Sequence, residues 1–340
     1  MSWTVLVTGA AGFIGMHLSL RLLAEGHRVV GIDNLNTYYD PALKQARLAR
    51  LQAHEGFTMR RIDLADADAV RAAFAETRPD RVVHLAAQAG VRHALEHPLD
   101  YTASNLAGST TVLEGCRRNE VEHLVFASSS SVYGGNIRVP FTETDPVDHP
   151  VSFYAATKRA NELMAHSYAH LFGLPVTMLR YFTVYGPWGR PDMAIWKFTD
   201  ALLAGRPIDV YAGGTLERDF TYVDDAVEAT LALLARAPQR RSPPDPALWR
   251  ASGPDASWAP FEIYNVGRSD PVTVNALLEL LEQATGRKAR RQELGLQPGD
   301  VARTFASTAK LAAATGFAPR VALPDGLASF VAWFRGWQAR

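Results

Sequence analysis

The stretch that decides the fold is Gly9-Ala10-Ala11-Gly12-Phe13-Ile14-Gly15. It follows a short β-rich run over 4–8 (TVLVT) and opens an apolar segment with helical periodicity through residue 24. Glycines at this spacing permit a tight turn and let the backbone approach a pyrophosphate, while the helix N-terminus offers free N–H groups. The spacing differs from Gly-x-Gly-x-x-Gly, so a purely structural turn is the alternative. The stretch nevertheless indicates a dinucleotide site.

The residues after this turn alternate between strand and helix patterns. A second strand is predicted over 27–32, ending in Asp33. Further strands are predicted over 57–62, 81–85, 123–127 and 176–181, and helices over 67–76, 104–119 and 154–172. Such alternation is typical of a parallel sheet with helices on both faces. We therefore expect an α/β fold with a Rossmann-type doubly wound parallel sheet and a smaller, mostly C-terminal α/β lobe for the substrate.

Asp33 bears on which dinucleotide is bound. An acid at the end of the second strand accepts hydrogen bonds from the adenosine ribose and repels a 2′-phosphate, so NAD is favoured over NADP. Asn34, beside it, is assigned to the same site. Asp63 ends the third strand, where it and Leu64 can reach the adenine. A helix cap is the alternative role for Asp63.

We expect residues 1–182 to form the NAD-binding domain, with segments near 215–235 and 261–268 returning to it. Residues 183–340 then form a discontinuous lobe for the substrate. Within this lobe, 238–260 is rich in proline, serine and arginine, which is typical of a surface loop or an insertion.

Tyr154-Ala-Ala-Thr-Lys158 places a phenol and an ammonium four residues apart on one face of a predicted helix. A free tyrosine, with a pKa of about 10, is too weak a base at neutral pH. A neighbouring Lys⁺ and the positive nicotinamide of NAD⁺ both favour the phenolate and lower its pKa. The spacing alone is common by chance, but here it follows a hydroxyl-rich strand end, Ser128-Ser129-Ser130-Ser131. Together the two stretches indicate hydride transfer at a carbinol.

Taken together, these residues resemble the extended short-chain dehydrogenase/reductases, and within them the nucleotide-sugar epimerase and dehydratase family. The resemblance covers nearly the whole chain. It implies that Tyr154 is the general base, Lys158 its electrostatic partner and ribose ligand, and Ser129 the hydroxyl that bonds the substrate's O4. It also implies an NAD that stays tightly bound and is regenerated in each cycle. The cofactor positions that it implies are Gly9, Gly12, Phe13, Ile14, Gly15, Leu85, Ala86, Ala87, Asn105 and Tyr181.

The residues beside Ser129 indicate which of the family's reactions the chain can catalyse. Family dehydratases follow this hydroxyl with an Asp-Glu pair, and family decarboxylases of UDP-glucuronate place a Glu two positions after it. Here Ser130 and Ser131 offer no carboxylate. Oxidation and re-reduction at C4 need no such acid, so the sequence favours a 4-epimerase, an isomerase.

Three longer stretches resemble the UDP-glucuronate 4-epimerases of this family, namely Asp33-Asn34-Leu35-Asn36-Thr37-Tyr38-Tyr39-Asp40, Ala86-Ala87-Gln88-Ala89-Gly90-Val91-Arg92 and Tyr181-Phe182-Thr183-Val184-Tyr185-Gly186-Pro187-Trp188-Gly189-Arg190-Pro191-Asp192. They imply NAD-dependent conversion of UDP-glucuronate to UDP-galacturonate through a bound 4-keto intermediate. Thr183, where galactose-type epimerases carry an asparagine, can hydrogen-bond a C6 carboxylate together with Ser129 and Ser130. Arg190 can hold a carboxylate or a phosphate. A loop-bracing role is the alternative for Arg190.

The resemblance also implies the rest of a UDP-sugar site. Arg218 matches the arginine that holds the diphosphate, and Asp300 matches the acid on the uridine ribose. Gln297 stands where galactose-type epimerases have an arginine that contacts a phosphate. Arg92 or Arg190 is expected to replace that contact. Tyr211 is a candidate for stacking on uracil, a core position in a strand being the alternative.

Composition limits the partners. The 35 Lys and Arg residues balance 35 Asp and Glu residues, so no overall field favours nucleic acid or an anionic membrane. The single cysteine, Cys116, excludes an internal disulfide, and we see neither a signal peptide nor an apolar run of membrane length. We predict a cytoplasmic enzyme, and the resemblance implies a homodimer. No metal is predicted, because His84, His93 and His166 lack metal-ligand spacing.

Three alternatives stay open. Two lie within the family: a UDP-glucose/UDP-galactose 4-epimerase, and a UDP-glucuronate decarboxylase or related dehydratase. The third is a non-catalytic NAD-binding scaffold protein on the same fold. Such proteins usually lose the Tyr/Lys pair that this chain keeps.

Overall fold

Seven parallel strands form the central sheet of the computed structural model, which describes residues 2–241, 253–295 and 301–339. The strand order is β10–β6–β5–β4–β1–β2–β3. The bounds are β1 Thr4–Thr8, β2 Arg28–Asp33, β3 Phe57–Arg61, β4 Arg81–His84, β5 His123–Ser129, β6 Val176–Tyr181 and β10 Phe261–Val266. Most positions in these strands are buried and apolar, which is typical of a parallel sheet covered on both faces.

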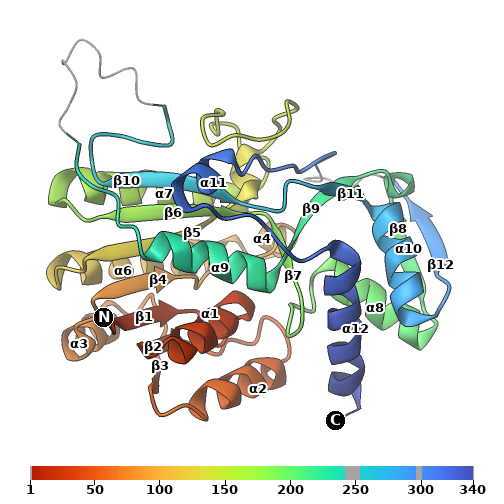
Figure 1. The fold of residues 1–340 in the computed structure, drawn as a ribbon, viewed down its shortest axis with the longest axis horizontal. Coiled ribbons are helices and arrows are strands. Elements are labelled where there is room, and N and C mark those ends of the chain that lie inside the picture. The colour runs from red at the N-terminus through yellow and green to blue at the C-terminus, as the bar shows by residue number, and fades with distance from the viewer. Residues whose placement is uncertain (1, 242–252, 296–300, 340) are drawn as a thin grey trace.

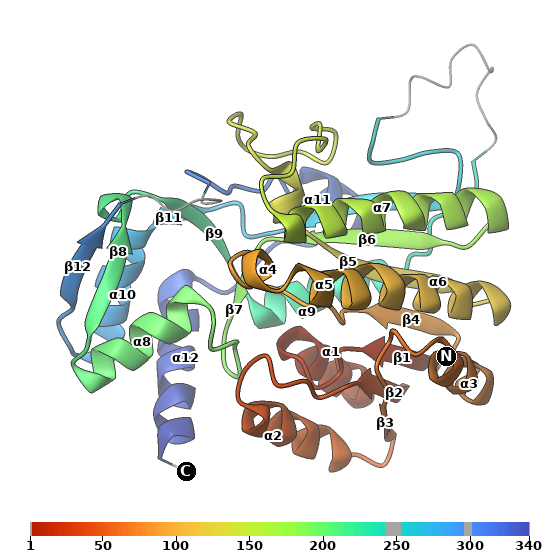
Figure 2. The same cartoon turned by 180° about the vertical axis from the view of Figure 1, so that it is seen from behind.

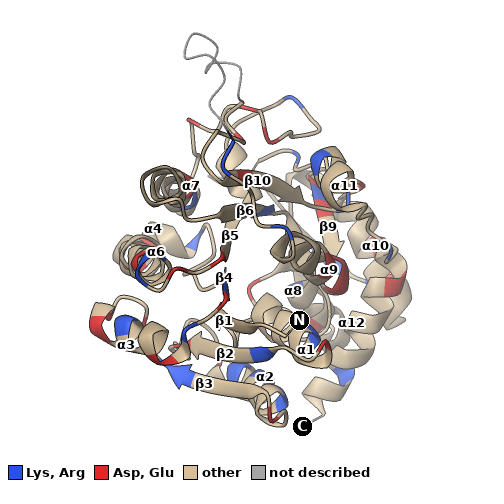
Figure 3. Cartoon of the chain, turned by 60° about the vertical axis from the view of Figure 1, so that its left-hand side comes forward, with Lys and Arg blue, Asp and Glu red and all other residues tan. Residues whose placement is uncertain are grey.

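Helices cover both faces of this sheet (Figure 3). On one face lie α3 Ala67–Thr77, α6 Gly108–Arg118 and α7 Phe153–Phe172. On the other lie α1 Phe13–Ala24, α9 Val223–Leu234 and α11 Ala309–Thr315, while α2 Pro41–Gln52 packs beside α1 and β3. Acidic and basic residues are interspersed on the helices of both layers (Figure 3). The apolar residues between sheet and helices form two large buried clusters, one on each face.

A smaller lobe packs beside the carboxyl ends of the central strands (Figure 1). It contains a three-stranded sheet, β11–β9–β7, and a parallel pair, β12–β8. Its strands are β7 Thr183–Tyr185, β8 Pro207–Tyr211, β9 Glu217–Tyr222, β11 Pro271–Thr273 and β12 Arg290–Leu294. Its helices are α8 Ala194–Ala204, α10 Val274–Thr285 and α12 Leu323–Gln338. The single turns α4 His93–Glu96 and α5 Pro98–Tyr101 lie beside α6 and α7 (Figure 2).

The predicted Rossmann-type α/β fold is confirmed, and most predicted strand bounds agree within one or two residues. The strand predicted over 123–127 continues through Ser129, because the serines pair in register with β6, Ser129 opposite Tyr181. The helix predicted over 104–119 begins earlier, as a π-helical segment over Thr102–Ala107. Helix α2 was not predicted. Part of the proline-rich stretch, 242–252, lies outside the described residues, and the division into two domains stays a prediction.

Among the described residues, no helix has both the length and the apolar character that a membrane crossing requires.

Candidate active site

A cavity of about 740 Å³ lies at the carboxyl ends of the central strands. The strand order reverses around β1, which sits between β2 and β4, and ligands of doubly wound sheets bind at such a switch point. The loops that leave β1 to β6 all contribute to the lining. The sequence-predicted residues that line it are Gly9, Gly12, Phe13, Ile14, Gly15, Asp33, Asn34, Asp63, Leu64, Leu85, Ala86, Ala87, Arg92, Ser129, Ser130, Tyr154, Lys158, Tyr181, Thr183, Arg190, Tyr211 and Arg218. Asp300 and Gln297 lie outside the described residues.

The backbone of the glycine turn leaves no space for a side chain at Gly9 or Gly15. Gly9 has a φ of +70°, and a Cβ there would lie 2.9 Å from the backbone nitrogen of Ala86. A Cβ on Gly15 would lie 2.0 Å from the carbonyl oxygen of Gly9. No side chain caps the start of α1 at Gly12, so its N-terminus presents backbone N–H groups, as anion binding requires. The turn therefore fits the diphosphate of a dinucleotide.

The carboxylates after β2 and β3 organise the adjoining loops. Asp33, only 8% exposed, accepts hydrogen bonds from the backbone N–H of Ala11 (3.2 Å) and of Leu35 (2.8 Å). Asp63 accepts from the Asn34 amide at 2.9 Å and from the Ala65 N–H at 2.9 Å. The helix that follows is capped by Asp66 rather than Asp63. Asp33 and Asp63 thus remain beside the cavity as acceptors.

Asn105 is the described residue that the structure does not bring to the cavity. It is fully buried behind the lining. Its amide accepts from the Gln88 N–H (2.8 Å) and donates to the Gln88 carbonyl (3.0 Å) and to Thr157 (3.0 Å). The side chain is thus fully engaged in fixing the loop after β4 against α7. Asn105 supports Gln88, which does line the cavity, and the direct cofactor contact predicted for Asn105 stays a prediction.

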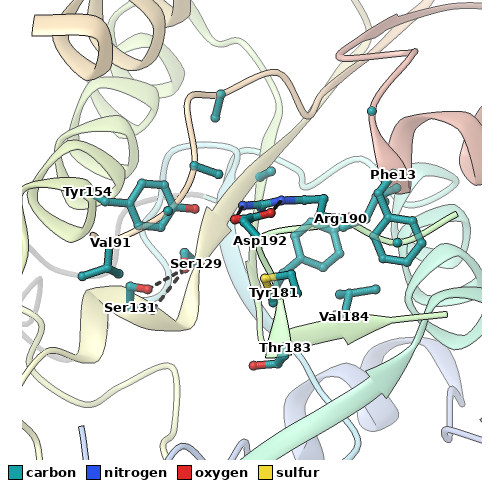
Figure 4. A pocket seen from close by; sticks show the side chains of 18 of the residues that line it. Phe13, Val91, Ser129, Ser131, Tyr154, Tyr181, Thr183, Val184, Arg190 and Asp192 are labelled. Atoms are coloured by element: carbon teal, nitrogen blue, oxygen red, sulfur yellow. Dashed lines mark hydrogen bonds and ion pairs between the residues drawn. The ribbon is translucent and has the colours of Figure 1, made fainter. Parts of the chain in front are cut away.

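Ser129 and Tyr154 face each other at the end of β5. Helix α7 starts beside the cavity because Ser152 caps it, accepting from the Ala155 N–H at 3.1 Å. One turn of helix then separates Tyr154 from Lys158. Tyr154 and Ser129 both line the cavity, and the Ser129 oxygen accepts from the Ser131 N–H at 3.1 Å. In Figure 4 the Tyr154 hydroxyl points across the cavity toward Arg190 and Asp192, with Ser129 and Ser131 nearby.

The protein alone does not activate the phenol. Burial raises the pKa of Tyr154 above its usual value, while the Ser129 hydroxyl and the charge of Arg190 oppose this rise. The Lys158 ammonium donates to the carbonyl of Ala127 at 3.0 Å, and its role as electrostatic partner of Tyr154 stays a prediction. Burial lowers the pKa of Lys158 to about 8. Lys158 is therefore still mainly protonated at neutral pH, and Tyr154 needs a further positive charge to act as a base.

Arg190 and Asp192 form an ion pair inside the cavity. The Nε of Arg190 donates to Asp192 Oδ1 at 3.0 Å, and a guanidinium nitrogen contacts the other carboxylate oxygen. The Tyr38 hydroxyl also donates to Asp192, at 3.3 Å. The pair is partly exposed, at 25% for Arg190 and 23% for Asp192. Thr183, the first residue of β7, lies across from it (Figure 4).

Arg92 and Tyr211 meet between the two lobes. The Arg92 guanidinium lies 4.8 Å from the ring centroid of Tyr211 and donates to its hydroxyl at 3.4 Å. Tyr211 ends β8 and is only partly buried, so it is not a strand-core residue. Arg218, in β9, donates to the Glu217 carbonyl at 2.8 Å and also lines the cavity. Arg92 and Arg218, the cations predicted to bind a UDP-sugar, thus both line the cavity.

Several polar residues that line the cavity were given no role from the sequence, among them Tyr38, Asp192 and Lys44. Tyr38 and Asp192 both lie in stretches quoted for the resemblance, so that pattern contained the signal. Lys44, in α2, donates to Asn36 at 2.6 Å, and a helix that was not predicted gave no reason to single it out. No group of three or more His, Cys, Asp or Glu side chains suited to a metal ion was found within 2–241, 253–295 and 301–339.

The model of the NAD dependent epimerase/dehydratase family matches residues 5–245. The chain belongs to this family. The probable UDP-glucuronate 4-epimerase of Rhizobium meliloti (strain 1021) is 48% identical to it over 97% of this chain and 96% of that relative.

Solved members of the epimerase/dehydratase family share the whole fold. The UDP-glucuronic acid 4-epimerase from Bacillus cereus, in complex with UDP-glucuronic acid and NAD, has a TM-score of 0.87 at 31% identity, covering 98% of this chain and 99% of that one. A Tyr-to-Phe mutant of that enzyme, with UDP-4-deoxy-4-fluoro-glucuronic acid and NAD, matches equally well. The UDP-glucose 4-epimerase of Thermus thermophilus, in complex with NAD, has a TM-score of 0.83 at 34% identity, with coverages of 98% and 99%.

Proposed function

We propose that this chain is an isomerase that converts UDP-glucuronate to UDP-galacturonate by NAD-dependent epimerisation at C4. The observation that carries the proposal is the meeting of Ser129 and Tyr154 at the cavity with hydroxyls, not carboxylates, at Ser130 and Ser131. Relatives that match nearly the whole chain carry the same activity in their names.

Two sets of residues would hold the cofactor. The glycine turn would receive the diphosphate at the start of α1, and Asp33 and Asn34 would bind the adenosine ribose, with Asp63 and Leu64 at the adenine. When bound, NAD supplies the hydride acceptor for C4 and a positive charge that favours the Tyr154 phenolate. Tight retention follows from the cycle, since the cofactor leaves the reaction in its starting form.

Tyr154 and Ser129 carry out the proton chemistry. Ser129 hydrogen-bonds the O4 atom, and Tyr154 removes the proton of the 4-hydroxyl as C4 is oxidised. The 4-keto sugar then turns over about its diphosphate link while Arg218 and Arg92 hold the UDP part. Tyr154 would return the proton to O4 when C4 is reduced on its opposite face.

The cavity must also protect the intermediate. A 4-keto uronic acid is a β-keto acid, which loses carbon dioxide when its carboxylate leaves the ring plane. Hydroxyls of Thr183 and Ser130 suit such a carboxylate, and Arg190 can hold either it or a phosphate. In either role the Arg190 nitrogen Nη1, which takes no part in its two bonds to Asp192, can donate to the substrate anion.

The test is incubation of purified protein with UDP-glucuronate, without added NAD, followed by NMR of the products. We expect UDP-galacturonate. UDP-xylose, or no conversion, would overturn the proposal. The second candidate function is UDP-glucose/UDP-galactose 4-epimerisation, which the similarity to the 34% identical UDP-glucose 4-epimerase supports. Rates measured in parallel on UDP-glucose distinguish the two functions. We expect UDP-glucuronate to react at least tenfold faster.

We also propose that the enzyme works in the cytoplasm as a homodimer. Exposed leucines gather on the α4–α5 and α7 side, with Leu95 68%, Leu99 78%, Leu163 57% and Leu171 68% exposed. Helix α7 contacts α4, α5 and α6, so the elements that carry these leucines lie together (Figure 2). Apolar side chains gathered in this way mark interaction sites. Light scattering should give twice the chain mass for the wild type and the single mass for Leu163→Glu; a wild-type monomer would refute the dimer.

A further inference from the structure

Arg47 is a fully buried cation in the middle of α2. Its hydrogen bonds go to neutral oxygens. Nη1 donates to the Tyr39 hydroxyl at 2.6 Å, and Nε and Nη2 donate to the Trp188 carbonyl at 3.1 and 2.6 Å. A buried guanidinium is tolerated only where its N–H groups find acceptors in the right directions. Arg47 is therefore held in one geometry by the segments that surround it.

These segments belong to the two halves of the active site. Besides Trp188, Arg47 donates to the Gly189 carbonyl at 2.9 Å, directly before Arg190. It also donates to the Ala11 carbonyl, inside the glycine turn, at 3.4 Å. One side chain thus links the turn that holds the dinucleotide to the loop that carries Arg190 into the cavity.

The loop that carries Arg190 needs such support. Trp188 has a φ of +64°, a left-handed conformation that non-glycine residues disfavour. The turn is closed by the Gly189 N–H, which donates to the Gly186 carbonyl at 3.0 Å. Holding the Trp188 and Gly189 carbonyls fixes the peptide planes from which Arg190 projects. Arg47 therefore determines where the Arg190 side chain starts.

A second contact runs between the same parts of the chain. Tyr38 lies between Asp33 and Arg47 in sequence and donates to Asp192, the partner of Arg190. Asp33 in turn accepts from the Ala11 N–H. Residues 33–47 thus touch the glycine turn at Ala11 from both ends and hold the Arg190–Asp192 pair from one side.

We propose that Arg47 is a positioning residue that couples the dinucleotide site to the placement of Arg190. The inference deepens the proposed function and rests on it for its product assay. It predicts that loss of Arg47 loosens both halves together: NAD is retained less well, and the uronate intermediate is less well protected from decarboxylation.

The experiment compares Arg47→Met, which keeps the aliphatic stem, with Arg47→Lys and with Arg50→Met. Arg50 is a matched control because it lies on the same helix and contacts the same residue, but through the ring of Trp188, 5.2 Å from the guanidinium. Two quantities are measured on the folded fraction: NAD released per chain on denaturation, and the ratio of UDP-pentose to UDP-galacturonate at saturating UDP-glucuronate. A product ratio does not depend on how much enzyme is folded, so a loss of stability alone leaves it unchanged.

For Arg47→Met we expect a product ratio at least tenfold above wild type and less than half of the wild-type NAD content. Arg47→Lys keeps the charge but not the forked geometry, so its product ratio and NAD content should lie between those of wild type and Arg47→Met. Arg50→Met should stay within twofold of wild type in both quantities. If Arg47→Met does not fold, the same readouts on Arg47→Lys decide, with a threefold rise in the ratio expected.

Several results would overturn the coupling. One is wild-type behaviour of the Arg47 variants in both readouts, and another is a change in only one of them, which would tie Arg47 to a single segment. Equal effects in Arg50→Met would mean that packing around Trp188, not the Arg47 hydrogen bonds, is responsible. If the wild type makes no UDP-galacturonate, the proposed function fails, whereas the NAD content of the variants still supports or refutes the link to the glycine turn.

Discussion

Replacing Tyr154 by phenylalanine removes one oxygen atom from the site and little else. The ring packs edge-on against Tyr101, with centroids 6.2 Å apart, and a phenylalanine can keep this contact. Ser129 keeps its hydrogen bonds to Ser131, because it accepts from the Ser131 N–H and donates to the Ser131 hydroxyl, both at 3.1 Å. The expected loss of stability is therefore at most about 1 kcal/mol, the worth of one hydrogen bond.

The expected loss of activity is much larger. General acid–base catalysis contributes roughly 10²–10⁴ in rate, and each factor of ten corresponds to about 1.36 kcal/mol of activation free energy. Tyr154→Phe should therefore lower kcat by at least two to three orders of magnitude, or about 2.7–4.1 kcal/mol. The glycine turn and Asp33 are untouched, so the variant should keep its NAD.

The assay follows UDP-galacturonate by NMR, with NAD content and thermal unfolding measured on the same preparations. Tyr168→Phe is the matched control, because Tyr168 lies on α7 as well but donates to Glu114, away from the cavity. It should keep near-wild-type turnover. Turnover of Tyr154→Phe within tenfold of wild type would remove Tyr154 from the mechanism, and loss of NAD with the activity would leave a binding defect as the explanation.

Four further substitutions, three at the site and one in the buried interior, test other parts of the structure. Thr183→Ala or Arg190→Ala should lower turnover or release a UDP-pentose, seen by NMR, whereas unchanged rates and product purity in both variants would contradict a carboxylate pocket. Burial lowers the pKa of Lys158 from 10.5 to about 8, so the unfolded chain binds more protons between these values and stability rises with pH through this window. Lys158→Met removes this pH dependence. The variant's free energy of unfolding in urea should exceed that of wild type by an amount that shrinks from pH 7 to pH 10. A difference that stays constant with pH would argue against the lowered pKa. Arg180→Met leaves the buried carboxylate of Glu162 without its bidentate partner. Chemical unfolding should show that the free energy of unfolding falls by at least about 3 kcal/mol, whereas a fall of less than about 1 kcal/mol would contradict this reasoning.

The sequence predicted the parts of the site that depend on local pattern. The glycine turn, Asp33 and the Tyr154/Lys158 pair are set by short-range spacing next to a strand or within a helix, and the structure brings them to one cavity. The serine run was predicted as a strand end, whereas β5 continues through Ser129 because β6 extends equally far beside it. Spacing alone does not reveal how far a neighbouring strand extends.

The parts that the sequence could not predict depend on contacts between distant segments. The acceptors of Arg47 are backbone carbonyls at Ala11, Trp188 and Gly189, and a carbonyl leaves no trace in the residue type. Asn105 has the residue type expected of a cofactor ligand, yet its amide is taken up by the backbone of Gln88. Which of two polar partners an amide chooses is decided by packing between α6, α7 and the loop after β4, not by local sequence.

The place of β10 in the sheet has a consequence for the order in which the chain can fold. β10 pairs along all six of its residues with β6. In sequence the two strands are separated by β7, α8, β8 and β9 of the smaller lobe. During synthesis at the usual 5–20 residues per second, β6 therefore emerges with a bare edge that stays uncovered for on the order of ten seconds. An unpaired parallel strand rich in apolar residues is a template for wrong pairing. The edge strand of the central sheet is thus made only after the first part of the smaller lobe, and a chain that ends before β10 leaves this side of the sheet open.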